Sequence, residues 1–282
     1  MTIEETVTHS PAPWRARIHL GFEPRAGRTR LTHRRHVGPL RVQKPFYPDD
    51  GACHVYLLHP PGGMAGHDEL SVDVDVAAGA HALLTTPAAN KMYRSGGPTT
   101  RLATRLNVSG ALEWLPQGSI LFGGSRVNQV TDIRLAPGAR LIAWDLLALG
   151  RAASGDHYAA GDYTQRLSVS LADAPLLLDR QSFAAGSDVL QAPWGLAGRG
   201  AIGTLLATPA DADLVALARA AATAGQVEVS LVRAGTEGQG LLIARALGDD
   251  VTRIQLALTP VWSALRPALL GCAAVPPRIW AT

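Results

Sequence analysis

The chain has 282 residues, of which 47% are hydrophobic and 17% are charged, so it can bury a core and has no compositional sign of global disorder. Its 26 Lys and Arg residues nearly balance 23 Asp and Glu residues, and the arginines are scattered rather than clustered with aromatic residues on one segment. This pattern argues against a nucleic-acid-binding protein. No apolar run approaches the roughly 18 residues that a membrane helix needs, which argues against a membrane protein.

Cys53 and Cys272 are the only cysteines, and neither belongs to a CxxC pair or a disulfide framework. This fits a reducing cytoplasm. Residues 1–13 are polar and lack the basic start and apolar stretch of a signal peptide. We expect residues 1–13 to form a flexible N-terminal segment and residues 14–282 a single β-rich domain in the cytoplasm.

Most of the chain alternates with period two between Gly or Pro turns, as half-buried strands do. A strand over residues 52–59 places Cys53 and His59 on one face and His54 on the other. The same alternation predicts strands over residues 70–76, 101–108 and 166–171. The turn spacing is compatible with a long antiparallel meander or with stacked sheets, and both remain open.

Two segments in the last third of the chain predict helices. Residues 211–224 are rich in Ala and Leu. The segment begins at Asp211 and is ended by Gly225. Residues 259–270 have Thr259 as a possible cap, Pro260 at the first helical position and Pro267 distorting the end. Residues 251–258 fit either a strand or an extension of this helix.

The GxGxxG pattern of residues 198–203 precedes an expected strand rather than a helix, so turn and bulge glycines explain it better than a phosphate-binding loop. Neither GxxxxGK[ST] nor GxSxG occurs. Donor side chains gather over residues 53–69: Cys53, His54, His59, His67, Asp68 and Glu69. Strand geometry favours hydrogen-bonded sheet histidines, but a metal-dependent hydrolase that uses His59, His67 and Asp68 is an alternative.

Asp145 lies inside the apolar run of residues 141–149, and Asp179 follows three leucines. A buried carboxylate is costly unless it is paired or hydrated, so each one either forms a structural ion pair or lines a polar cavity. Arg34 and Arg35 lie between His33 and His36, which indicates either a basic recognition patch or a solvated strand.

Several blocks of the sequence resemble the UreD (UreH) family of urease accessory proteins, in family order from about Trp14 to Thr282. The blocks are Val37-Gly-Pro-Leu-Arg-Val-Gln-Lys-Pro-Phe-Tyr-Pro48, His54-Val-Tyr-Leu-Leu-His-Pro-Pro-Gly-Gly63, Thr85-Thr-Pro87, Lys91, Tyr93-Arg-Ser95, Leu112-Glu-Trp-Leu-Pro-Gln117, Trp144-Asp145, Leu149-Gly-Arg151 and Pro277-Arg-Ile-Trp280. Blocks of this length are far more specific than a short motif.

The resemblance implies a mainly β fold of layered, stacked sheets with a β-helix-like arrangement and two α-helices near the C-terminal third. It also implies a non-enzymatic scaffold for urease maturation that binds apo-urease, UreF and UreG and helps insert nickel, which is transferred rather than kept. Family positions associated with a polar nickel tunnel match Asp68, Asp145 and Asp179. Glu69 and Glu113 are weaker candidates, because they only neighbour matched motifs.

Three positions depart from the family pattern. The family's Gly-Gly-Asp is Gly66-His67-Asp68 here, the acidic residue after Leu-Pro-Gln is Gly118, and the proline after Leu-Gly-Arg is Ala152. His67 therefore adds a possible nitrogen donor beside Asp68.

Overall fold

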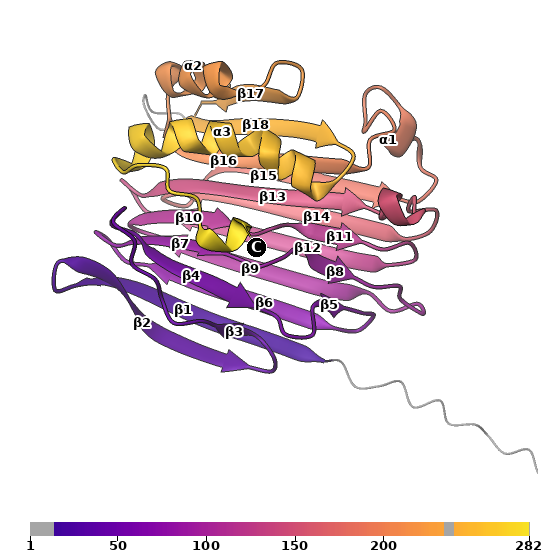
Figure 1. Cartoon of the computed structure of the whole chain (residues 1–282), viewed down its shortest axis with the longest axis horizontal. Coiled ribbons are helices and arrows are strands. Elements are labelled where there is room, and N and C mark those ends of the chain that lie inside the picture. Colours follow the sequence, from indigo (N-terminus) through magenta and orange to yellow (C-terminus); the bar gives the residue numbers. More distant parts are fainter. Residues whose placement is uncertain (1–13, 234–239, 282) are drawn as a thin grey trace, which may run out of the picture.

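The computed structural model describes residues 14–233 and 240–281, and it is mainly β, as the sequence predicts. Two facing sheets and an outer layer of helices make up the molecule (Figure 1). The expected flexible segment, residues 1–13, lies outside the described residues.

Sheet I is the seven-stranded sheet, in the order β15-β14-β12-β9-β6-β1-β2. Its strands are β1 (Arg15–Arg25), β2 (Arg28–Val37), β6 (Glu69–Val76), β9 (Thr100–Val108), β12 (Arg126–Leu135), β14 (Asp162–Leu171) and β15 (Ala174–Ala184). Sheet II is the eleven-stranded sheet, with the main order β17-β18-β16-β13-β10-β7-β4-β3. Its strands are β3 (Arg41–Val42), β4 (Cys53–Leu58), β5 (Gly63–Met64), β7 (His81–Thr85), β8 (Asn90–Met92), β10 (Ala111–Leu115), β11 (Ser119–Leu121), β13 (Arg140–Leu149), β16 (Ala201–Ala210), β17 (Val227–Val232) and β18 (Gly240–Gly248).

The middle of the molecule is a stacked coil. The chain passes from sheet II through a short corner strand to sheet I and back, in the turns β4-β5-β6, β7-β8-β9 and β10-β11-β12. Equivalent strands of successive turns pair in parallel. Antiparallel pairs flank this coil, with β1 and β2 at one end and β14 and β15 at the other. Of the two arrangements left open by the sequence, the structure has stacked sheets, arranged like a β-helix.

Period-two alternation explains the core between the sheets. Buried side chains of β6 and β1, such as Val72 and Ile18, point toward buried residues of β4 and β13, such as Val55 and Leu141. The opposite face of β13 carries Trp144 and Leu146, which pack against the helices. Because β13 is buried on both faces, its sequence is a continuous apolar run.

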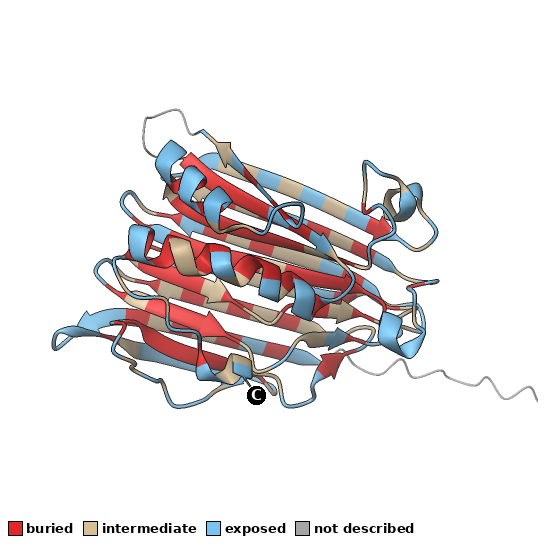
Figure 2. Ribbon diagram, turned by 45° about the horizontal axis from the view of Figure 1, so that its top comes forward, coloured by how far each residue is buried: buried red, intermediate tan, exposed pale blue. Residues whose placement is uncertain are grey.

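The helices are the short α1 (Asp188–Gln191), α2 (Ala212–Ala221) and α3 (Val251–Leu270), with one-turn 3-10 helices η1 (Ala152–Ser154) and η2 (Arg278–Ala281). The buried residues of α3 face sheet II (Figure 2). The predicted helix over residues 211–224 is confirmed as α2, and its N-cap Asp211 accepts the N–H of Leu214. None of the helices within the described residues combines the length and hydropathy that crossing a bilayer requires.

The predicted helix over residues 259–270 is present, and of the two possibilities left open for residues 251–258 the structure has the helical extension. Helix α3 begins at Val251, capped by the Asp250 carboxylate, which accepts the N–H of Arg253. Pro260 and Pro267 are both exposed, so the carbonyl groups that lose a helical partner can bind water, and the helix continues through both prolines.

The glycines of residues 198–203 serve turn and packing roles, and strand β16 begins among them at Ala201 and includes the predicted strand over residues 204–209. Gly198 has a φ of +75° in the turn. Gly203 lies under α3, where a Cβ atom would be 2.2 Å from Ile254 Cγ2, so it allows the helix to approach the strand closely.

Candidate functional site: a polar cavity between the sheets

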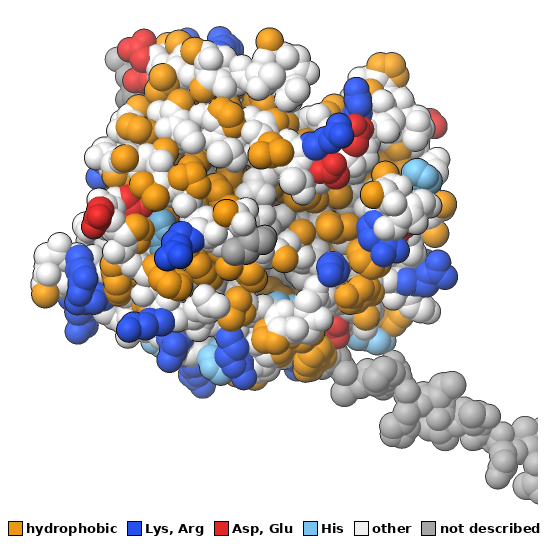
Figure 3. Space-filling view, viewed as in Figure 1, with side chains coloured by type: hydrophobic (Ala, Val, Ile, Leu, Met, Phe, Trp, Pro, Cys, Tyr) orange, Lys and Arg blue, Asp and Glu red, His pale blue; other side chains and the backbone are white. Residues whose placement is uncertain are grey.

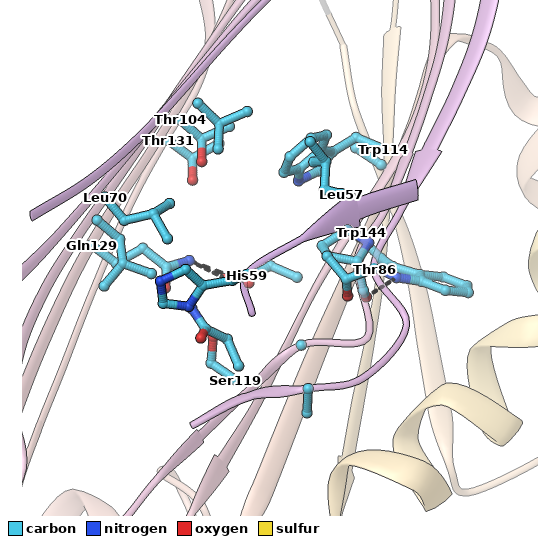
Figure 4. Close-up of a pocket in the computed structure, with 18 of the residues that line it drawn as sticks. Leu57, His59, Leu70, Thr86, Thr104, Trp114, Ser119, Gln129, Thr131 and Trp144 are labelled. Carbon is cyan, nitrogen blue, oxygen red and sulfur yellow. Dashed lines mark hydrogen bonds between the residues drawn. The ribbon is translucent and has the colours of Figure 1, made fainter. Parts of the chain in front are cut away.

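A cavity of about 290 Å³ lies between sheets I and II. Figure 4 shows Leu70, Thr104, Gln129 and Thr131 projecting into it from sheet I, opposite Leu57 and Trp114 of sheet II. The cavity is large enough for several water molecules, and its polar groups give such waters hydrogen-bond partners. Polar residues thus interrupt an otherwise apolar core.

Asp145 is the carboxylate that faces this cavity. It lies on the side of β13 that points toward sheet I and keeps some accessible surface because it borders the cavity. Gln129 Nε2 donates to both of its oxygens at 3.3 Å, and Gln165 Nε2 also donates to it. Burial, together with the nearby negative charge of Asp179, raises the pKa of the Asp145 carboxyl. No cation is among the groups that bind it directly in the described chain.

Asp179 lies on β15, at the edge of sheet I. Its Oδ2 accepts a bond from Arg245 Nη2 at 2.6 Å and another from Gln181 Nε2 at 3.1 Å. The Asp179 side chain is 15% exposed and the Arg245 side chain 44% exposed, so this ion pair lies between the inner cavity and solvent. Asp179 is electrostatically coupled to Asp145, so the two predicted carboxylates belong to one polar region.

His59 lines the cavity just after β4 (Figure 4). Its Nδ1 is buried and has no hydrogen-bond partner among the described residues. Burial lowers the pKa of the imidazole, and the charge of Asp68 partly offsets this. A neutral imidazole with a free ring nitrogen is a suitable donor for a borderline metal ion such as nickel.

Asp68 lies in the loop that precedes β6, where its carboxylate accepts the N–H of Ala65 at 2.8 Å. Glu69, a weaker candidate, lies on the outer face of sheet I and pairs with Arg15 at 3.0 Å and Arg101 at 3.7 Å. His67 has a φ of +75°, a left-handed conformation that favours glycine. The backbone therefore explains why glycine suits this position in the family pattern.

The described residues contain no group of three or more His, Cys, Asp or Glu side chains close enough to hold one metal ion. Asp68, Asp145 and Asp179 therefore do not share one ligand sphere in this part of the chain. The same holds for His59, His67 and Asp68, so the hydrolase alternative has no preformed metal site among these residues.

Glu113 faces the helix layer rather than the cavity. Arg266 of α3 donates to it at 2.9 Å, Trp262 Nε1 at 2.8 Å, and His81 lies 2.9 Å away. Arg266 also pairs with Asp50 at 2.7 Å. The partners of Glu113, chiefly His81 and then Arg266, outweigh burial and hold the pKa of its carboxyl below the usual value.

Asp50 accepts a bond from His54 at 2.8 Å, so the interpretation of His54 as a hydrogen-bonded sheet residue is confirmed, whereas the same interpretation is wrong for the Nδ1 of His59, which has no partner among the described residues. Sequence reasoning missed the cavity residue Gln129 and the polar partners Gln165 and Arg245. Each occupies an ordinary polar position in an alternating strand; the strand register places Gln129 beside Gln165, and the packing of sheet I on sheet II brings both to Asp145.

The family model described as UreD urease accessory protein matches residues 15–281. The chain belongs to the UreD family. A relative named urease accessory protein UreD from Alkalilimnicola ehrlichii is 46% identical, covering 95% of this chain and 92% of the relative. Proteins of the same name from Pseudomonas putida W619 and Klebsiella pneumoniae MGH 78578 are 43% and 42% identical, covering 100% and 95% of this chain and 100% and 96% of their own lengths. Membership in the UreD family assigns the chain an accessory role in urease maturation.

Proposed function

We propose that this UreD-family chain is a non-enzymatic cytoplasmic scaffold that binds apo-urease and UreF, with UreG joining the complex, and that nickel passes through its inter-sheet cavity toward urease. The family membership supports the maturation role. The polar residues Asp145, Gln129 and His59 in an otherwise mostly apolar cavity support the passage of a cation through the core.

The observation that carries the nickel proposal is the Asp145 carboxylate, which is deep in the molecule and, among residues 14–233 and 240–281, is bound only by neutral amide groups. Leaving a carboxylate there without a cation is costly, as its raised pKa indicates. A divalent cation at this position compensates the charge while it is bound. Oxygen ligands bind nickel less firmly than nitrogen or sulfur ligands, which suits a cargo that must leave again.

His59 and Asp179 extend this route beyond Asp145. His59 offers its free Nδ1 inside the cavity, and Asp179 lies toward the solvent-exposed Arg245. Asp68 lies near His59 and is our proposed contact beyond it. Because these groups do not form one preformed ligand cluster among the described residues, the arrangement favours transfer over storage.

The proposal is tested by urease activity and nickel per urease active site in a host that carries the source urease genes with or without this gene. We expect inactive, nickel-poor urease without the gene. Asp145→Asn keeps the size of the side chain but removes its charge, and should lower nickel loading by about tenfold or more. Normal loading by this variant would contradict passage past Asp145.

The matched control is Asp75→Asn, because Asp75 lies on the outer face of sheet I and pairs there with His19. It should load urease as the wild type does. Unchanged urease activity after loss of the gene would contradict the accessory role itself. Co-purification of apo-urease and UreF with the Asp145→Asn variant separates a defect in nickel passage from a defect in assembly.

A further inference from the structure

The cationic residues are not scattered evenly, contrary to the sequence-based expectation. Residues 15–44 contain eight arginines and one lysine but a single carboxylate, Glu23, so this segment has a formal charge of +8 whereas the whole chain has +3. The rest of the chain is therefore net negative by 5. Such a concentration of one sign makes a strong local field.

This segment forms the β1–β2 hairpin and the start of the following loop, and β2 is the last strand of sheet I. The hairpin lies along the lower margin of the molecule in Figure 1, where Lys, Arg and His side chains gather in Figure 3. One end of the coil is therefore strongly cationic.

The second half of β2, residues 32–37, is exposed on both faces. Arg34 and His36 pair with Leu20 and Ile18 of β1, which are completely buried, yet they are exposed themselves. Val37 is 59% exposed. Among the described strands, β2 pairs only with β1, so within this part of the chain the other side of the strand offers unpaired backbone N–H and C=O groups.

The arginine side chains of this hairpin differ in whether they have an interaction partner. Arg17 pairs with Asp73 at 3.0 Å, while Arg28 and Arg30 stack over the ring of Tyr47. Arg34 and Arg35 have neither an ion pair nor a hydrogen bond within the described part of the chain. The free guanidinium groups and the free backbone edge thus lie on the same six residues.

We propose that residues 32–37 of β2 are a docking site for an extended acidic segment of a partner protein, which adds to sheet I as a further strand. Backbone pairing along the edge supplies affinity, and carboxylates that meet Arg34 and Arg35 supply selection. The proposal concerns a separate surface and does not depend on nickel passing through the cavity.

Two other occupants fit this edge less well. A second copy of the chain would bring the same cationic edge against itself, and the like charges would repel. A single-stranded nucleic acid needs exposed aromatic side chains for its bases to stack on, and residues 28–37 contain no Phe, Tyr or Trp and only the two histidines His33 and His36. The unpaired backbone of an edge strand is instead the feature that an added protein strand uses.

The test uses the whole chain and a fluorescein-labelled peptide of alternating glutamate and valine, about eight residues long to match a strand. Binding is followed by fluorescence anisotropy. The variant that changes both Arg34→Glu and Arg35→Glu should raise the dissociation constant by about tenfold or more. The matched control changes Arg166→Glu and Arg180→Glu, a neighbouring exposed pair at the opposite edge of sheet I, and should bind as the wild type does.

Two further measurements separate strand addition from simple charge attraction. A peptide of the same sequence with alternate N-methylated amides keeps its charge but cannot pair along the edge, so it should bind at least about tenfold more weakly. Hydrogen exchange should slow at residues 32–37 when the unmodified peptide is bound.

Three results would overturn the inference: no binding of the acidic peptide by the wild-type chain, equal binding of the N-methylated peptide, or tighter binding of an oligothymidylate of the same net charge. Each leaves the role in urease maturation intact, because none of these probes involves urease or nickel. Circular dichroism of both double variants shows whether a loss of binding reflects a loss of fold.

Discussion

Two buried carboxylates, Asp145 and Glu113, show how neighbours decide the ionisation of a residue in this core. The pKa of Asp145 is raised because burial and the charge of Asp179 outweigh two neutral amide donors. The pKa of Glu113 is lowered because His81 and Arg266 overcome burial. The partners of Glu113 thus stabilise its ionised carboxylate, whereas no cation among the described residues binds the carboxylate of Asp145.

Asp145→Asn should therefore stabilise the protein while it impairs nickel delivery. A group whose folded-state pKa is raised contributes stability below its unfolded pKa and loses it as the pH rises through the folded pKa. Asparagine resembles the protonated acid, so the free energy of unfolding near neutral pH should rise. Chemical denaturation should show this gain shrinking as the pH falls toward the unfolded value of 3.8. A destabilised variant near neutral pH would contradict the argument.

The left-handed backbone conformation at His67 makes glycine a better replacement than alanine for removing its side chain. Alanine at a φ of +75° keeps the strain of an L-residue, whereas glycine relieves it. We expect His67→Gly to be more stable than His67→Ala by roughly 1 kcal/mol in chemical denaturation. If His67 supplies a nickel ligand, calorimetric titration with nickel should show the same loss of affinity in both variants. Wild-type affinity in both would exclude that role.

At the scale of elements, one ion network fastens the last helix to sheet II. Arg266 of α3 is completely buried and reaches Glu113 on β10 and Asp50 in the loop before β4. Trp262, one turn earlier, also donates to Glu113. The helix is therefore fixed in register as well as packed, because these bonds form at only one position along the sheet.

Arg266→Met should lower the free energy of unfolding by about 3 to 5 kcal/mol, because it leaves two buried carboxylates without their cation. Arg253→Met, on the exposed face of the same helix, should change it by less than about 0.5 kcal/mol. Urea denaturation near neutral pH measures both variants. Similar small costs for the two arginines would show that the network adds little to stability.

The sequence predicts the elements better than their partners. Alternation located β6 and β9, and composition located α2, because side-chain burial follows local geometry. The parallel direction of pairing depends on backbone bonds, and the passage of α3 through Pro260 and Pro267 depends on solvent reaching the two exposed prolines, which no side-chain pattern encodes. For the site, an acid within an apolar run identified Asp145, whereas Gln165 came only with the strand register and the packing of the two sheets.

At the scale of the whole molecule, the fold is a parallel coil bounded by antiparallel strands at both ends. Neighbouring parallel strands of the coil are separated by only one turn of the chain. For example, Asn107 of β9 donates a hydrogen bond to Asp75 of β6, 32 residues earlier. Each turn of the coil thus buries its face against the turn before it, as repeat proteins do. Stability should be greatest in the middle of this stack and least in the end strands.

Amide hydrogen exchange measured by mass spectrometry should follow that order. The central strands β9 and β12 have paired neighbours on both sides and should exchange slowest. Residues 32–37 of β2, which are exposed on both faces, should exchange fastest among the strands of sheet I. Equal protection of β2 and β9 would show that sheet I opens only as a unit.

The Arg266 network also affects how the chain folds while the ribosome synthesises it. Asp50 and Glu113 precede their common cation by 216 and 153 residues. A ribosome that makes the chain from its N-terminus releases the first coil turns long before α3 exists. During that interval the helix-facing side of sheet II is uncovered, with two carboxylates that water must solvate. Aggregation and the action of cellular chaperones on the nascent chain should therefore concentrate on this face, until the arrival of Arg266 closes it.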